Sequence, residues 1–184
     1  KKQNKWRKSE YELCFEHDMQ WILDNADRLS APVIHDAPYD KDIELIDGQG
    51  AGDYNRLEDL LNELAKEPSV AIDLETNGLR PYIDDPKIHL CAIGTFSKVV
   101  AFPMDHPDGW NTNIRRRVFA LLADFLLSSN KKIAHHLGFE LEWLTFFYGR
   151  DLANLTEWED TMAQAHTIDE RIGTLSLNDL TRQY

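Results

Sequence analysis

Two carboxylates one residue apart, Asp73 and Glu75, have the spacing in this sequence that most directly suggests chemistry. They follow a short apolar run, 70–72, which has the length of a buried strand. Because residues two apart on a strand point to the same face, both carboxylates would project together, with Leu74 on the other face. Their mutual repulsion favours a divalent cation, and oxygen ligands suit Mg²⁺ or Mn²⁺. The spacing alone also allows two solvated carboxylates at a strand end.

A second polar pair lies further along the chain. His136 and Glu140 are four residues apart at the start of a predicted helix, so they share one helix face. Phe139, Trp143 and Phe147 repeat at the same interval and predict an apolar stripe beside them. A carboxylate one turn into a helix can supply a third metal ligand. The competing interpretation is that Glu140 is a surface charge and that the histidines only begin the helix.

The pattern of apolar residues predicts an α/β fold, a mixed sheet with helices packed against it. Strands are predicted over 43–46, 70–75, 88–96, 99–102 and 131–134. Helices are predicted from Asp53, over 112–127, over 137–148, over 161–168 and from Ser176, with Asp53, Asp160 and Ser176 as caps. Three arginines, 115–117, lie in the first turn of the helix over 112–127. They are expected to form a solvated face, and a phosphate contact is the alternative.

The first 41 residues are predicted to form an N-terminal extension. A helix is expected over 9–29, capped by Ser9 or Asp18, and two prolines within 30–39 indicate a linker. Residues 42–184 are then the main domain. The sequence therefore predicts one α/β domain preceded by a helical extension.

Composition limits the classes of function. The chain has 184 residues, 42% of them hydrophobic, and no apolar run long enough to span a membrane. The N-terminus shows no signal peptide, and Cys14 and Cys91 lack metal-ligand spacing, so a cytoplasmic protein with reduced thiols is expected. The net charge of −12 argues against tight non-specific binding of a duplex. It leaves open a strand end that is bound through metal ions.

Four sequence motifs follow one another in a characteristic order along the chain. Asp-Leu-Glu-Thr at 73–76 is followed by a hairpin ending Val-Ala-Phe-Pro-Met-Asp-His, then by Ile-Ala-His-His-Leu-Gly-Phe-Glu and Glu-Asp-Thr-Met. This order resembles the 3′→5′ proofreading exonuclease domain of family A DNA polymerases, a member of the DEDD exonuclease superfamily. The resemblance covers roughly residues 43–184. It implies an RNase H-like mixed sheet flanked by helices, with Asp160 as a helix cap.

The resemblance also implies a site. Asp73 would bridge two divalent ions, Mg²⁺ or Mn²⁺, Glu75 would help bind the first and Glu140 would serve the second through waters. The substrate would be the 3′ end of single-stranded DNA, shortened one nucleotide at a time. Thr76 and Leu79 would hold the terminal nucleotide, together with His136 and Phe139. For Leu79, a role in anchoring the loop is the alternative.

The sequence departs from the family pattern in two ways. Glu140 stands where the family has Asp, and His136 stands where it has Asn. The family's third motif, a Tyr or His four residues before an Asp, is expected beyond Tyr184, followed by a polymerase domain. We therefore expect residues 1–184 alone to be nearly inactive.

Two other functions remain open from the sequence. One is an RNA-trimming exonuclease of the RNase D type, which would use the same metal ions. The other is a non-catalytic exonuclease-like module, which the departure at Glu140 and the lack of the third motif before Tyr184 favour.

Overall fold

The computed structural model describes residues 43–149, 154–168, 170 and 175–183, together with residues 15, 17, 19–21, 23 and 24. The chain divides into two compact units, Lys1–Pro38 and Tyr39–Tyr184. The described residues of the first unit are helical, and Gln20 Nε2 donates a hydrogen bond to Asp24 Oδ1 at 2.8 Å. They lie within the helix predicted over 9–29; its remaining residues and the predicted caps Ser9 and Asp18 lie outside the described residues.

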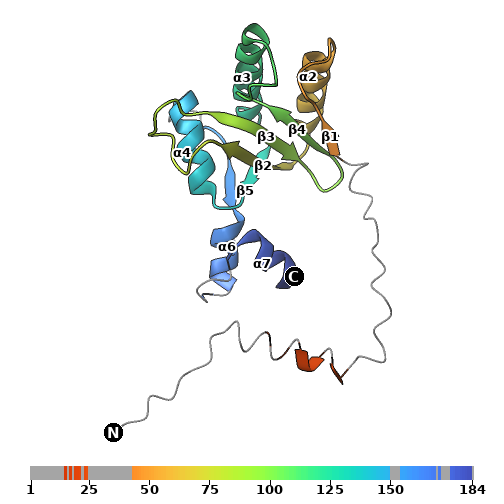
Figure 1. Ribbon diagram of the computed structural model, residues 1–184, viewed down its shortest axis with the longest axis vertical. Coiled ribbons are helices and arrows are strands. Elements are labelled where there is room, and N and C mark those ends of the chain that lie inside the picture. The colour runs from red at the N-terminus through yellow and green to blue at the C-terminus, as the bar shows by residue number, and fades with distance from the viewer. Residues whose placement is uncertain are drawn as a thin grey trace. The chain divides into compact units, whose positions relative to one another are not determined.

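The second unit is built on a mixed sheet (Figure 1). Its described strands are β1 (Ile43–Leu45), β2 (Ser69–Thr76), β3 (Ile88–Gly94), β4 (Val99–Pro103), β5 (Lys131–Ala134) and β6 (Trp158–Asp160). They lie in the order β1-β4-β3-β2-β5-β6. Strand β3 runs antiparallel to both of its neighbours, whereas the β1–β4, β2–β5 and β5–β6 pairs are parallel. The predicted mixed sheet is thus confirmed.

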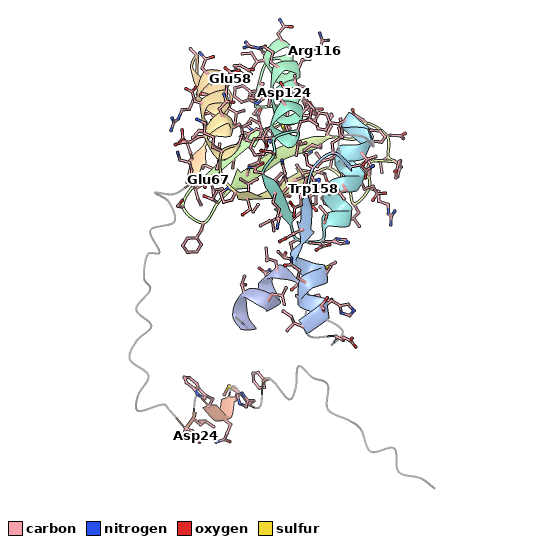
Figure 2. The ribbon with its side chains drawn as sticks, turned by 180° about the vertical axis from the view of Figure 1, so that it is seen from behind. Asp24, Glu58, Glu67, Arg116, Asp124 and Trp158 are labelled. Atoms are coloured by element: carbon pink, nitrogen blue, oxygen red, sulfur yellow. The ribbon has the colours of Figure 1, made fainter. Side chains whose placement is uncertain are left out.

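Helices lie at the predicted positions along the chain. They are α2 (Asp53–Leu64), α3 (Thr112–Leu126), α4 (Leu137–Tyr148), α6 (Thr161–Ile168) and α7 (Leu177–Gln183). Helices α2 and α3 lie side by side (Figures 1 and 2), and α4 contacts β5 and β6. The predicted α/β class is therefore confirmed.

Alternation along β2 separates the core from the site. Val70, Ile72 and Leu74 are buried with the apolar faces of α2 and α3, whereas Asp73 and Glu75 are exposed. Full burial of each such apolar side chain stabilises the fold by about 1.5–3 kcal/mol. Because a shift of one residue would bury the carboxylates, the apolar face fixes the register that keeps Asp73 and Glu75 outside the core.

The three arginines of α3 serve packing more than ligand binding. Arg115 forms an ion pair with Asp105, and the Arg117 guanidinium lies 3.8 Å from the centre of the Tyr54 ring. Arg116 lies at the exposed end of α3 (Figure 2). The interactions of Arg115 and Arg117 favour the predicted solvated face over a phosphate contact.

Two details differ from the sequence-based expectation. Asp53 is the first residue of α2 and not its cap, because its carboxylate accepts hydrogen bonds from Gly48 N and Gly50 N, both at 3.0 Å. Strand β6 is absent from the sequence-based prediction, because three residues are too few to show an alternation of apolar and polar side chains. It forms because Trp158–Asp160 pairs with Lys132–Ala134 of β5.

A buried polar turn joins α3 to β5 and fixes where β5 begins. Lys132 is fully buried, and its Nζ donates to Ser128 O at 2.5 Å and Asn130 O at 2.8 Å. Asn130 Nδ2 donates to Leu64 O at 3.0 Å, which ties the same turn to the end of α2. Burial lowers the pKa of Lys132 to about 8. These bonds satisfy carbonyls that burial would otherwise leave unpaired.

Gly48 is a position where only glycine fits. Its φ is +79°, and a Cβ there would lie 2.7 Å from the Trp110 ring, which Trp110 Nε1 holds by donating to Pro103 O. We expect Gly48→Ala to lower the free energy of unfolding by about 2–4 kcal/mol, measured by urea denaturation. Gly52→Ala is the control, since a Cβ there meets nothing within 4 Å. Equal stabilities of the two variants would contradict this account.

Candidate active site

The first two predicted ligands share one face of β2. Asp73 pairs with Ala92 and Glu75 with Leu90 on β3, and the register shifts between Glu75 and Thr76. Leu74, between the two carboxylates, is 4% exposed. The shift is a bulge, which bends a strand where it leaves the sheet. The backbone thus confirms that Asp73 and Glu75 project to the same side.

Glu140 is a buried carboxylate in the first turn of α4. Its side chain is 3% exposed, and its Oε2 has no hydrogen-bond partner among the described residues. Burial raises the pKa of Glu140 to about 7, and the negative charges of Asp73 and Asp160 add to the rise. The surface-charge interpretation of Glu140 is therefore wrong. Its carboxyl lies within electrostatic reach of Asp73.

A cleft of about 380 Å³ has Glu75 in its lining, whereas Asp73 and Glu140 are not among the lining residues. Its lining residues are Leu74, Glu75, Thr76, Asn77, Gly78, Leu79 and Phe139. It brings together Glu75 with three of the predicted substrate-binding residues, Thr76, Leu79 and Phe139. Leu79 is 87% exposed, so it does not anchor the loop in the core. The Thr76 hydroxyl donates to Gly78 O at 2.7 Å, which holds the turn that forms the cleft wall.

His136, the fourth predicted substrate-binding residue, does not line this cleft. It precedes α4 with φ +67° and ψ +50°, a left-handed conformation in which Asn, Asp and His are enriched. Its side chain is exposed. The conformation gives a backbone reason for His136 at this position, where the resemblance implies Asn, and its role toward substrate stays a prediction.

Asp160 connects the two helices that begin beside the site. Its Oδ1 accepts from Met162 N at 2.8 Å and Ala163 N at 3.2 Å, which caps α6 as predicted. The same carboxylate also accepts from His136 N at 3.2 Å and Leu137 N at 3.1 Å, at the start of α4. The second role was not predicted, because no local pattern links residues so far apart in sequence. Asp160 therefore fixes the helix turn that carries Glu140.

The comparison with protein families decides what kind of domain this is. A model of the 3′–5′ exonuclease family, within the DEDD superfamily, matches residues 49–184. The chain belongs to this family. The match covers strands β2 to β6, the carboxylates and the cleft described above, so this is an exonuclease domain.

The fold of the exonuclease domain is supported by one solved structure. RNase D of Escherichia coli, an exoribonuclease involved in structured RNA processing, aligns with a TM-score of 0.54 and 19% identity, over 77% of this chain and 33% of that one. The EXO domain of Nibbler from Aedes aegypti aligns with a TM-score of 0.47 and 13% identity, over 72% of this chain and 58% of that one. No curated protein sequence matches the chain. This chain thus spans 58% or less of either structure.

The side chains of the site suit a hard cation, although they are not gathered into a ligand cluster. In the parts of the chain that the structure describes, no three Asp, Glu, His or Cys side chains come close enough to hold one ion. Buried Glu140 Oε2, which no described residue pairs, and Asp73 within electrostatic reach nevertheless fit a divalent ion that takes oxygen ligands. The ligand roles of Asp73, Glu75 and Glu140 stay predictions.

His135 has a structural role that the sequence left open. Its Nε2 lies 2.9 Å from Leu175 O, and its Nδ1 lies 3.0 Å from Thr161 Oγ1. Because a carbonyl can only accept, Nε2 donates to Leu175 O. The Thr161 hydroxyl in turn donates to Ala134 O at 3.3 Å. His135 therefore ties the end of β5 to α6 and to the segment before α7.

Cys91 is buried beside the site and unsuited to nucleophilic chemistry. Burial raises the pKa of its thiol, and the charges of Asp73 and Glu140 raise it further.

Among the described residues, no helix combines the length and the apolar composition that crossing a bilayer requires.

We expect Asp160→Ala to destabilise the exonuclease domain by about 1–3 kcal/mol, because amide N–H groups of two helix starts lose their acceptor. Asp160→Asn should cost less, since its Oδ1 still accepts while its Nδ2 faces Leu137 N. Urea denaturation measures both, with the exposed Asp59→Asn on α2 as control. Equal stability of the Ala variant and the control would show that the double cap is dispensable.

The pKa of Glu140 predicts a pH dependence of stability in the absence of metal. Its folded-state pKa of about 7 lies above the ordinary 4.5, so the folded state binds more protons between these values. The free energy of unfolding should therefore fall as the pH rises through this window. Glu140→Gln should remove about 1–3 kcal/mol of that fall between pH 4 and 8.

Urea denaturation in EDTA at pH 4 and pH 8 measures this difference. Glu58→Gln on α2, far along the chain from α4, is the control for the loss of one carboxylate (Figure 2). A Glu140→Gln variant with the pH dependence of the parent protein would show that Glu140 is ionised throughout.

Proposed function

We propose that this exonuclease domain removes nucleotides one at a time from the 3′ end of a single strand, with two divalent ions, Mg²⁺ or Mn²⁺, held by Asp73, Glu75 and Glu140. The observation that carries the proposal is the buried carboxyl of Glu140, whose Oε2 has no hydrogen-bond partner among the described residues and which lies within electrostatic reach of Asp73. A carboxylate is kept in such a place at a cost in stability, and a cation is the partner that offsets it.

The cleft residues act on the terminal nucleotide. Divalent ions, when bound, supply Lewis-acid activation of water and stabilise developing negative charge. Leu79 and Phe139 offer apolar surface to the base and sugar, which requires no reading of sequence. Thr76 Oγ1 is committed as a donor to Gly78 O and so keeps its lone pairs for a hydroxyl of the substrate. Glu75 lines the same cleft and would lie near the 3′-terminal nucleotide.

Single-stranded DNA is the substrate we propose first, in the proofreading domain of a family A DNA polymerase. The order of the four sequence motifs supports it, including Asp-Thr-Met at the start of α6. On this proposal a polymerase domain follows the present residues. The acidic charge of −12 agrees with a substrate taken as a frayed end and not as a duplex.

RNA is the second candidate. The fold likeness to RNase D of Escherichia coli, with a TM-score of 0.54, favours it. The 2′-hydroxyl is the group that would distinguish the two substrates, and the cleft offers it Thr76 and Asn77 as polar neighbours. A non-catalytic module that binds either strand is the remaining outcome.

The test is release of 3′ mononucleotides by the full-length protein, with Mn²⁺, from DNA and RNA oligonucleotides of one sequence. We expect faster release from DNA, and a loss of at least about 100-fold in Asp73→Ala because a metal-binding carboxylate supplies several kcal/mol. Glu67→Gln, an exposed carboxylate that precedes β2 (Figure 2), is the control.

Each result bears on a different part of the proposal. Faster release from RNA would replace the polymerase assignment with the RNase D type. Binding of both strands without release would indicate the non-catalytic module. Full activity of a correctly folded Asp73→Ala variant would remove Asp73 from the site.

A further inference from the structure

The loop between β2 and β3 exposes large apolar side chains next to the cleft. Leu79, Tyr82 and Ile83 are 87%, 71% and 42% exposed, and Phe146 of α4 is 46% exposed. We call these four side chains the loop–helix surface. Apolar side chains that gather outside the core mark interaction sites more often than single ones do.

Hydrogen bonds between the two ends of this loop hold its backbone in one conformation. Asn77 N donates to Lys87 O at 3.1 Å, and Lys87 N donates to Asn77 Oδ1 at 2.8 Å. Asn77 Nδ2 also donates to Asp85 O at 2.9 Å, and Pro81 is buried. These bonds close the two ends of the loop on each other. Its apolar side chains are therefore presented on a fixed backbone.

The loop is also docked on α4 (Figure 1). The Tyr82 and Phe146 rings meet edge to face, with centroids 6.0 Å apart. Arg80 Nη1 lies 3.3 Å from Glu142 Oε1. This contact orders Tyr82 while leaving most of its ring open to solvent. A rigid, exposed aromatic ring loses little entropy when another flat group stacks on it.

The surface is continuous with the cleft that would hold the terminal nucleotide. Gly78 and Leu79 line the cleft, and Ile83 Cδ1 lies so close to Gly78 that a Cβ there would be 2.8 Å away. The Arg80 side chain, 73% exposed, adds a cation beside the aromatic pair. Asp84 and Asp85 are exposed nearby, but Lys87 Nζ pairs with Asp85 at 2.7 Å. A single strand leaving the cleft suits this mixture of apolar rings and a cation.

We propose that the loop–helix surface binds the single strand upstream of its 3′ end, with a base stacked on Tyr82 and Arg80 near a phosphate. The proposal rests on the proposed function, since it assumes that the cleft holds the 3′ nucleotide. It adds a second contact, outside the cleft, that selects substrates by the length of their single-stranded end. Stacking of this kind does not distinguish one base from another.

The experiment compares strands that carry or lack a single upstream base. Steady-state release by the full-length protein is measured with Mn²⁺ on an eight-nucleotide strand and on the same strand with one abasic site, scanned through positions two to five from the 3′ end. Tyr82→Ala should lower kcat/KM on the intact strand by about 5- to 100-fold, mainly through KM. At the stacking position, the abasic site should lower the kcat/KM of the parent protein but not that of Tyr82→Ala.

Tyr82→Phe should restore the parent values, because the ring is kept. Phe96→Ala is the matched control, since Phe96 is a fully exposed aromatic residue in the turn at the other end of β3. Equal losses on intact and abasic strands, or no loss in Tyr82→Ala, would overturn the proposal while leaving the exonuclease intact. If the parent protein neither binds nor shortens any strand, the proposed function itself fails, and this inference fails with it.

Discussion

The structure of the site depends on one buried carboxylate. Glu140 lies in the first turn of α4 at 3% exposure, its Oε2 has no hydrogen-bond partner among the described residues, and the charge of Asp73 acts on it. A carboxyl in that place is either protonated or matched by a cation, because an isolated buried charge is too costly. Its pKa of about 7 means that the change between the protonated and the ionised carboxyl falls near neutral pH. Metal binding and proton release at this site are therefore expected to be coupled, as they are wherever a ligand must lose its proton.

Holding that carboxylate requires the polar junction between β5, α4 and α6. Asp160 accepts from amides at the start of both helices, and His135 bridges to Thr161 and Leu175 O. Amide N–H groups at helix starts have no partner within their own helix, so a carboxylate is a natural one. The junction places a second negative charge near Glu140 and so contributes to its raised pKa. The same residue therefore positions Glu140 and makes its ionised form less favourable.

Sequence patterns predicted the elements well and the junction poorly. The helical repeat of apolar residues predicted α2, α3 and α4 close to their observed bounds. The alternation of apolar and polar residues predicted the face of β2 that carries Asp73. Strand β6 and the second role of Asp160 depend on pairing between distant segments, which no local period records. The motif order predicted the 3′–5′ exonuclease family, and the family model confirmed it. The burial of Glu140 was left open, because a carboxylate at that spacing reads equally well as a surface charge.

The charge of the chain limits how such a domain can hold a strand. The net charge of the chain is −12, which works against the non-specific affinity that counterion release supplies. The α3 arginines do not restore that affinity, since Arg115 pairs with Asp105 and Arg117 stacks on Tyr54. On the proposed function, affinity would come from ions at the carboxylates and from apolar contact at Leu79, Phe139 and Tyr82. Both sources act on a single-stranded end and hardly at all on a closed duplex, whose bases are already stacked. The acidity of the domain and its exposed rings thus favour the same substrate form.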